Sequence, residues 1–308
     1  MRHFWILLIS WFSFINVAEA LTWSSGTTAP NGGYFEDVGY GNGLFVGSGP
    51  SPILSSSDNG ATWANPTNNG AWNTGVAYGA SRYVVAGPNV LSTSSDGVTW
   101  TNGSWPNWYP GITYGGGLFV AVGDLGGSNS YIRTSTDGLN WTDRVSPISG
   151  GLTSVVYGNG LYVAVRGTTG SINQVITSPD AVTWTARSAA VQSDWQSVTY
   201  GGGVYVAVST AGLVMSSSDG INWVQRTPAL STSWSAVTYG NGLFVAVSDA
   251  GTSVNSIMTS TDGANWTADT APTSGIWYGV AFGNGYFVAT GNSNVTMYAQ
   301  YAPSSPSS

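Results

Sequence analysis

A short pattern recurs seven times along this 308-residue chain and limits the folds that it can adopt more than any other feature. Each copy has an aromatic-Gly turn, which is aromatic-Gly-x-Gly in six of the seven copies and ends in Ser81 in the copy at Tyr78, followed by an alternating apolar run, as in Thr199 to Val208. The seven turn aromatics are Tyr40, Tyr78, Tyr114, Tyr157, Tyr200, Tyr239 and Phe282. Their spacing of 36 to 43 residues is the sequence signature of a repeat architecture.

Each copy predicts four strands. The first ends at the turn aromatic, and the Gly-x-Gly turn joins it to the second because glycine reaches positive φ without a Cβ clash. A third strand follows, such as Tyr131 to Ser135, and a fourth starts at a tryptophan after a second turn. Four-stranded sheets repeated radially form a β-propeller. The sequence therefore predicts an all-β fold, a seven-bladed β-propeller of four-stranded blades.

The second turn of each copy carries a resemblance to a known family. Ser56 to Trp63 matches Ser-x-Asp-x-Gly-x-Thr-Trp, the Asp box of bacterial neuraminidase (BNR) repeats, and five further copies are one residue shorter. The chain from Leu21 to Tyr301 thus resembles the sialidase-like propellers of the YCF48 and sortilin type. In that family the Asp box is a folding device at the blade periphery. The resemblance implies structural roles for Asp58, Asp96, Asp137, Asp180, Asp219 and Asp262.

The seventh copy is incomplete. Trp277 to Tyr301 predicts three strands and has no Asp box, whereas Leu21 to Trp23 resembles the Val182 to Trp184 segment of another copy. We therefore expect the N-terminal segment to supply the outer strand of the last blade, since this closure covers an otherwise unpaired edge. The predicted propeller spans residues 21–302, and the Pro/Ser-rich tail at 303–308 is expected to be disordered.

Residues 1–20 have the pattern of a signal peptide. Arg2 precedes a largely apolar stretch, and Ala18-Glu19-Ala20 has the form of a signal-peptidase site. An uncleaved anchor is the alternative, but the apolar stretch is shorter than the roughly 20 residues that span a bilayer. The sequence predicts secretion, to the extracellular space or the periplasm.

The chain after residue 20 contains no Lys, Cys or His. This composition excludes Ser-His-Asp triads, cysteine nucleophiles, lysine Schiff bases and His/Cys zinc sites. Only 7% of the residues are charged, the net charge is −7, and the arginines are scattered, so nucleic acid and anionic membranes are poor partners. No cofactor, metal or membrane insertion is predicted.

Strand order places the loops between second and third strands on the same face as the crossovers between blades, and in sialidase-like propellers this face carries the ligand. Most copies have an aromatic near the start of the first strand. These rings are expected either to stack on sugars or to wedge between blades. The candidate ligand-binding tryptophans are Trp72, Trp108, Trp195, Trp234 and Trp277.

Three loops on the same predicted face are long and polar, at 124–130, 167–174 and 249–256. Long loops on a rigid scaffold often carry function, although surface loops also tolerate insertions at little cost. The candidate hydrogen-bonding residues in these loops are Asp124, Asn129, Asn173, Asp249 and Asn255.

Catalytic signals are weak. The Phe/Tyr-Arg-Ile-Pro motif of sialidases is absent, and glycosidases need two carboxylates that face each other across the sugar. The sequence favours a secreted, non-catalytic binding propeller that recognises a neutral glycan or an extracellular protein. The alternatives are a degenerate sialidase-like glycoside hydrolase and a purely structural or docking propeller. Oligomeric state is not indicated.

Overall fold

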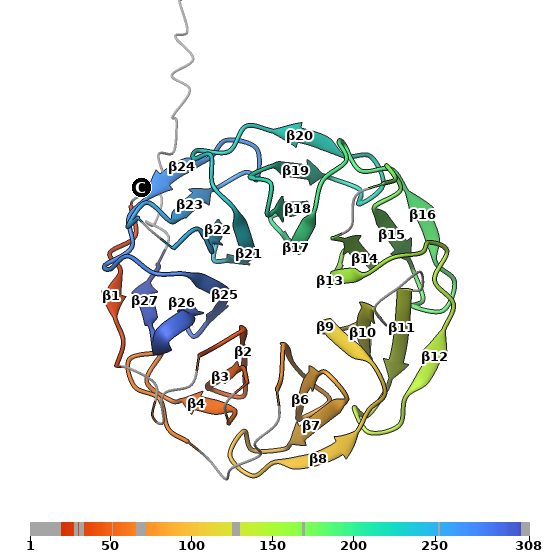
Figure 1. Cartoon of the computed structure of the whole chain (residues 1–308), viewed down its shortest axis with the longest axis horizontal. Coiled ribbons are helices and arrows are strands. Elements are labelled where there is room, and N and C mark those ends of the chain that lie inside the picture. Colours follow the sequence, from red (N-terminus) through yellow and green to blue (C-terminus); the bar gives the residue numbers. More distant parts are fainter. Residues whose placement is uncertain are drawn as a thin grey trace, which may run out of the picture.

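The computed structural model describes residues 20–27, 30, 34–50, 52–65, 72–124, 130–167, 170–251 and 253–302. These residues form seven antiparallel sheets arranged radially around a central axis (Figure 1). The predicted seven-bladed β-propeller is confirmed. Most of the predicted signal peptide and the whole of the tail at 303–308 lie outside the described residues. The described part contains no helix long and apolar enough to cross a membrane.

The strands occupy four positions in the blades, from the axis outward. The innermost strands are β2 (Asp37–Gly41), β5 (Gly75–Gly79), β9 (Trp108–Gly115), β13 (Leu152–Gly158), β17 (Trp195–Gly201), β21 (Trp234–Gly240) and β25 (Trp277–Gly283). The second strands are β3 (Leu44–Ser48), β6 (Arg82–Gly87), β10 (Leu118–Asp124), β14 (Leu161–Arg166), β18 (Val204–Ser209), β22 (Leu243–Ser248) and β26 (Tyr286–Gly291). The third strands are β4 (Leu54–Ser56), β7 (Val90–Ser94), β11 (Ser130–Ser135), β15 (Val175–Ser178), β19 (Val214–Ser217), β23 (Ile257–Ser260) and β27 (Thr296–Gln300), and a short 3-10 helix, η2 (Asn292–Asn294), precedes β27.

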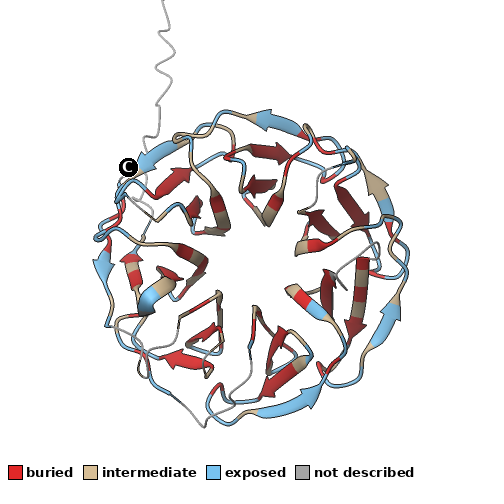
Figure 2. Cartoon of the chain, viewed as in Figure 1, coloured by how far each residue is buried: buried red, intermediate tan, exposed pale blue. Residues whose placement is uncertain are grey.

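The outermost strands are the most exposed part of each blade (Figure 2). They are β8 (Thr101–Ser104), β12 (Thr142–Arg144), β16 (Thr185–Arg187), β20 (Val224–Arg226), β24 (Thr267–Asp269) and β1 (Ser24–Ser25). In the first blade the fourth strand is reduced to an isolated bridge between Ser55 and Ala64. The second strands are buried on both faces because each lies inside its own sheet and is covered by neighbouring blades, which explains their continuous apolar runs.

A ring of contacts between glycines and aromatic side chains joins all seven blades. Each innermost strand ends at a glycine, and a Cβ added there would lie about 2 Å from the ring of the next blade's turn aromatic, as for Gly201 and Tyr239. The ring is closed, because Gly283 of the last blade meets Tyr40 of the first. The other pairs are Gly41–Tyr78, Gly79–Tyr114, Gly115–Tyr157, Gly158–Tyr200 and Gly240–Phe282. The turn aromatics thus set the distance between blades.

Aspartates stabilise six of the turns between third and fourth strands. In every one, a serine Oγ donates to Oδ1 of the aspartate at 2.8–3.0 Å. In the Asp219 turn the same Oδ1 accepts the backbone N–H groups of Ile221 and Asn222, each at 2.8 Å. Donors that bind only the ionised carboxylate hold its pKa below the usual value of 3.8, to about 2 for Asp96 and Asp262.

The N-terminal segment closes the ring as expected. β1 pairs with β27, with Ser24 opposite Tyr298 and Ser25 opposite Met297. The strand follows Trp23 just as the outer strands of other blades follow their tryptophans, and both Leu21 and Trp23 are buried in the last blade's core. The last blade therefore contains strands from both ends of the chain.

The closure predicts that removal of residues 21–25 will destabilise the protein. Deletion exposes the edge of β27 and removes two buried apolar side chains, each worth roughly 1.5–3 kcal/mol. We expect a lower melting temperature and aggregation on heating. The matched control is Ser24→Ala, which keeps the backbone pairing and should melt like the unmodified protein. An unchanged melting curve for the deletion would contradict the closure.

The contact ring predicts that Gly201→Ala is severe, because the new methyl group would overlap the ring of Tyr239. Overpacking of this kind costs about 3 kcal/mol. Gly103→Ala on the exposed strand β8 is the control, since its Cβ would meet only one atom, at 3.6 Å, and its effect should lie within about 0.5 kcal/mol. Chemical denaturation of both variants measures the difference, and equal losses would refute the role of the ring.

The turn aspartates predict acid instability. Because their pKa values in the folded state lie below 3.8, the unfolded state binds more protons as pH falls, and the stability that they provide at neutral pH is lost from about pH 5 toward pH 2. Melting temperatures measured across this range should fall less steeply for Asp96→Asn, which cannot titrate. If the two proteins lose stability in parallel, the Asp96 turn does not contribute.

Candidate functional site

Two positions at the beginning of every innermost strand, or just before it, lie at the mouth of the central channel, and twelve of these fourteen residues line the cavity there. They lie four and three residues before the turn aromatic, as Gln196 and Ser197 do before Tyr200. The first position is occupied by Glu36, Thr74, Pro110, Thr153, Gln196, Ser235 and Tyr278. The second is occupied by Asp37, Gly75, Gly111, Ser154, Ser197, Ala236 and Gly279. We call these fourteen residues the mouth ring.

A β-bulge directs side chains of the mouth ring toward the axis. Trp195 pairs with Ser209 and Ser197 with Val208, which leaves Gln196 as an extra residue between them. The same register shift occurs at the equivalent position in blades 4, 6 and 7. A bulge bends the strand and turns the extra side chain out of the regular alternation. Irregular pairing therefore places the lining residues of blades 4 to 7, whereas β2 and β5 pair without a shift.

The mouth ring encloses a cavity of about 170 Å³ to which all seven blades contribute. It opens on the face that carries the loops between second and third strands, because the innermost strands begin where the second strands end, as in the pairing of Leu152 with Arg166. This is the face that the sequence analysis predicted for a ligand.

Neutral hydroxyl and amide groups line the cavity in blades 4 to 6. Two hydroxyls join neighbouring blades, since Thr153 Oγ1 donates to the carbonyl of Trp195 at 2.7 Å and Ser235 Oγ to that of Trp277 at 2.6 Å. Among the described residues, none forms a hydrogen bond with the side chain of Gln196, which faces the same cavity. A free amide in a cavity is available to a ligand.

Carboxylates and aromatic rings line the opposite part. Asp37 Oδ2 accepts the N–H of Val76 at 3.0 Å, and Glu36 accepts hydrogen bonds from Trp72 and Tyr34. Burial raises the pKa of Asp37 to about 7, against the lowering effect of its backbone donors, and burial also raises the pKa of Glu36. The ring of Tyr278 lies 6.3 Å from that of Tyr34, centroid to centroid.

The five candidate tryptophans fall into two groups. Trp72 is 50% exposed and Trp108 47% exposed, and the indole N–H of Trp108 donates to Thr74 Oγ1 of the mouth ring at 3.3 Å. Trp108 lines the cavity, and Trp72 lies next to Glu36, which also lines it. Trp195, Trp234 and Trp277 have no exposed surface and pack in the apolar core between blades. A fully covered ring has no face for a sugar, so these three residues fit the wedging alternative and not ligand stacking.

The difference arises from an offset of one residue. In blades 2 and 3 the positions equivalent to Trp195 are held by Asn73 and Tyr109, which are fully buried, whereas Trp72 and Trp108 precede them and lie outside the packed layer. Sequence reasoning treated all five tryptophans as equivalent. Counting back from each turn aromatic separates them.

The candidate loop residues are dispersed. Asn129 and the side chain of Asp124 lie outside the described part of the structure. Asn173 and Asn255 are exposed, and neither lines the cavity. Their loops form hydrogen bonds to the segment after the outermost strand, where Ala189 N–H donates to the carbonyl of Ile172 and Ala271 N–H to that of Val254. Asp249 is close enough to raise the pKa of Tyr278 by its charge. Of the candidate loop residues whose side chains are described, Asp249 is the one near the mouth.

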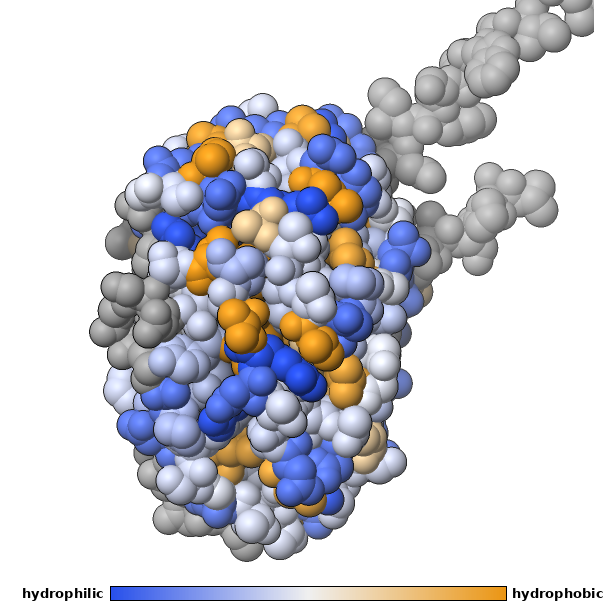
Figure 3. All heavy atoms as spheres, turned by 90° about the vertical axis from the view of Figure 1, so that its right-hand side faces the viewer, coloured by the Kyte–Doolittle hydropathy of each residue, from blue (hydrophilic) through white to orange (hydrophobic). Residues whose placement is uncertain are grey.

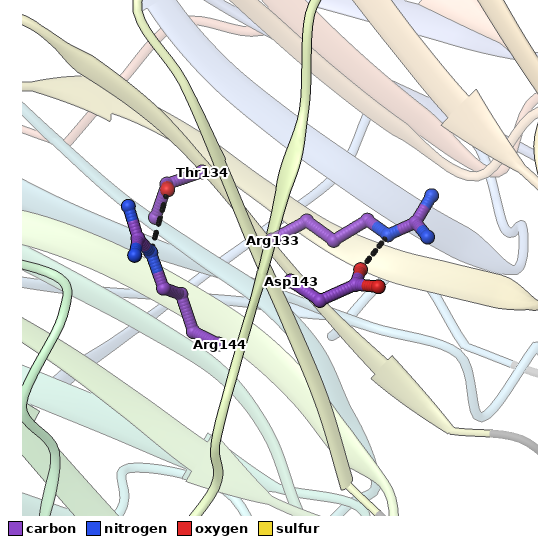
Figure 4. A network of polar contacts seen from close by, with 4 residues as sticks. All are labelled: Arg133, Thr134, Asp143 and Arg144. Carbon is purple, nitrogen blue, oxygen red and sulfur yellow. Dashed lines mark hydrogen bonds and ion pairs between the residues drawn. The ribbon is translucent and has the colours of Figure 1, made fainter.

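Four of the arginines form polar contacts in the outer part of the blades. Arg144 Nε donates to Thr134 Oγ1 at 3.0 Å, and equivalent bonds join Arg187 to Thr177 and Arg226 to Ser216. Arg133 forms an ion pair with Asp143 on the other face of the same strands (Figure 4). Of the residues that the structure describes, no arginine lines the cavity, and the two carboxylates that do, Glu36 and Asp37, are adjacent in the sequence, so the mouth lacks the facing acid pair of a glycosidase.

Other surfaces present weaker candidates. On the side of the molecule drawn in Figure 3, apolar and polar patches alternate over the outer wall. A second, shallow hollow of about 450 Å³ lies beside β12, lined by Asp143, Arg144 and the segment Val145–Ser149. No group of three or more His, Cys, Asp or Glu residues that could hold a metal occurs among the residues that the structure describes.

The mouth ring was not identified from the sequence. Its polar members vary in number and type from copy to copy, with two in blades 1, 4 and 5 and none in blade 3, so no motif marks them. A signal was nevertheless present, since the position four residues before each turn aromatic can be read directly from the repeat. The β-bulge at this position, however, is recognised only from the strand pairing in the structure.

Comparisons with known proteins show similarity in structure alone. No family model and no curated protein matches the sequence. Among solved structures, YCF48 bound to D1 peptide superposes with a TM-score of 0.70 at 16% identity, over 92% of this chain and 97% of that chain. Virginiamycin B lyase from Staphylococcus aureus gives 0.76 at 11% identity, over 92% and 100%. The WD40 β-propeller domain of Doa1 gives 0.68 at 11%, over 92% and 98%. At these identities, the likenesses establish a shared β-propeller fold.

Proposed function

We propose that this chain is a secreted, non-catalytic binding propeller that holds an extracellular protein by a peptide segment at the channel mouth. The observation that carries the proposal is the position of Trp72 and Trp108. Of the tryptophans that the structure describes, these two are the exposed ones. Trp108 lines the cavity to which all seven blades contribute, and Trp72 lies next to Glu36, which also lines it. Exposed tryptophan is unusual in a free surface and frequent in binding sites.

Three features support binding over catalysis. The cavity lacks a facing carboxylate pair, no arginine lines it, and the chain after residue 20 has no histidine, lysine or cysteine nucleophile. The structure of the similar propeller YCF48 contains a D1 peptide, which makes a peptide a natural first ligand class to test. The Ser-x-Asp turns also support assignment of the repeats to the BNR type, although that resemblance concerns folding and not ligand choice.

A neutral glycan is the second candidate. Tryptophan faces stack on sugar rings, and the free amide of Gln196 together with nearby hydroxyls offers hydrogen bonds to sugar hydroxyls. This candidate differs from a peptide in one measurable respect, since a neutral sugar has no charge for salt to screen.

The test uses arrays of short peptides and of neutral oligosaccharides, followed by measurement of the affinity of the best binder. We expect peptide binders whose affinity falls at least about tenfold, or 1.4 kcal/mol, for the double variant Trp72→Ala/Trp108→Ala, because truncation of exposed aromatic anchors removes most of their contact area. Gln196→Ala should weaken binding less, because an amide orients the ligand and adds little area.

The controls are Val224→Ala and Gln225→Ala on the exposed outer strand β20, which match the substitutions in type but lie far from the axis. Neither should change affinity or melting temperature. The proposal fails if the arrays yield no binder, or if binding survives in a correctly folded double variant. Binding of oligosaccharides alone, with the same dependence on both tryptophans, would favour the glycan candidate instead.

A further inference from the structure

We propose that the Glu36/Asp37 part of the channel mouth binds a single alkylammonium or guanidinium group, the head of a lysine or arginine side chain. The proposal rests on the proposed function, because it assumes that the ligand enters this cavity, and it adds the chemical class of the group that enters. Four observations lead to it: uncompensated charge, aromatic surroundings, cavity size and the absence of a metal-type ligand set.

The charge of the cavity is one-sided. Glu36 and Asp37 are its only ionisable acids, and no basic residue is among its lining residues. Arg166, which ends β14 on the same face, is buried and donates through Nη1 to the carbonyl of Ser149 at 2.7 Å. The hydrogen bonds that the two carboxylates accept come from neutral donors. Among the residues that the structure describes, no cation lines the cavity to balance their negative charge.

Burial of a carboxylate without a neighbouring cation destabilises its ionised form. Burial raises the pKa of Asp37 to about 7, and the neighbouring charge of Glu36 acts in the same direction. A cation placed beside them would reverse this effect, since an opposite charge within a few Å favours the ionised carboxylate. The cavity thus has a stronger electrostatic preference for a cation than for a neutral group.

Aromatic side chains surround the same carboxylates. Trp72 and Tyr34 donate to Glu36, and Tyr278 lies beside Tyr34 at the edge of the cavity. The faces of Trp and Tyr rings attract ammonium and guanidinium groups, by about 0.5–1 kcal/mol at exposed sites and more where water is excluded. Carboxylates with flanking aromatic rings therefore suit an organic cation in particular.

The size of the cavity selects one small group. Its volume of about 170 Å³ is below the roughly 300–1,000 Å³ of sites that enclose a whole small-molecule ligand. One side-chain head fits these dimensions better than an oligosaccharide does. A divalent metal is a poor fit as well, because calcium needs six to eight oxygen ligands and the described cavity supplies two carboxylates.

The test titrates the protein with n-butylammonium, with n-butylguanidinium and with butan-1-ol as the neutral analogue. The reporter is the indole N–H signal of Trp72 in two-dimensional NMR, assigned with Trp72→Phe. We expect both cations to shift this signal with at least about tenfold higher affinity than butan-1-ol, and the affinity to fall as salt is raised. Equal affinities for butan-1-ol and butylammonium, or no shift with either cation, would overturn the proposal.

Variants locate the charge. Glu36→Gln and Asp37→Asn should each weaken cation binding several-fold and leave butan-1-ol unaffected. Asp143→Asn, which removes the same charge from the exposed strand β12, is the control and should bind like the unmodified protein. Amide replacements keep an oxygen that can accept the existing hydrogen bonds, and the titrations of the unmodified protein stand even if a variant fails to fold. Unchanged cation affinity in both folded variants would refute the assignment.

Cation affinity should also rise between pH 5 and pH 8 as Asp37 loses its proton. The other titratable groups near this corner are Glu36, Tyr34, Tyr278 and Asp249; the pKa values of both tyrosines are raised above 10, so they stay neutral over this range. This inference and the proposed function fail differently. Array peptides that bind through Trp72 and Trp108 but carry no basic group would refute the proposed binding of a cationic group, and the proposed peptide site would still stand.

Discussion

The contact between a strand-ending glycine and the next blade's aromatic ring is the constraint on which this propeller depends. Each ring lies where a β-carbon would be, so the two residues must occur together in every copy. Seven such contacts close on themselves and fix how near the innermost strands approach one another. The channel, its mouth ring and the cavity of about 170 Å³ are consequences of that spacing. The repeated turn is therefore both a local hairpin signal and the element that positions the site.

The fold was predictable because its determinants repeat. Glycine turns, apolar second strands and tryptophans before outer strands recur in register, and each recurrence strengthens the same interpretation. Even the closure by Leu21 to Ser25 could be inferred from a missing piece in one copy and a matching piece at the other end. The first blade was less predictable, since its outer strand shrinks to one bridge despite a complete-looking second turn.

The site was predictable only in its general location. The sequence analysis named Trp72 and Trp108, which are exposed, together with three tryptophans that are wholly buried. It could not separate the two groups, because composition does not record a shift of one position within a strand. Glu36 and Gln196 have no motif at all. Gln196 matters because a bulge turns it out of the regular alternation. Glu36 matters because the outer strands engage three of the arginines that would otherwise be candidates to neutralise the acids. When each blade contributes one or two residues to a central site, those residues lie far apart in the sequence and form no motif.

The pairing of β1 with β27 joins residues separated by more than 270 positions. During synthesis the last blade has no outer strand until the earliest residues and the latest ones meet, so six blades can assemble while the ring stays open. Contacts between distant residues form slowly because a long loop must close first. Ring closure is then the natural final step of folding, and a chain that ends early keeps an unpaired sheet edge that distinguishes it from the finished protein.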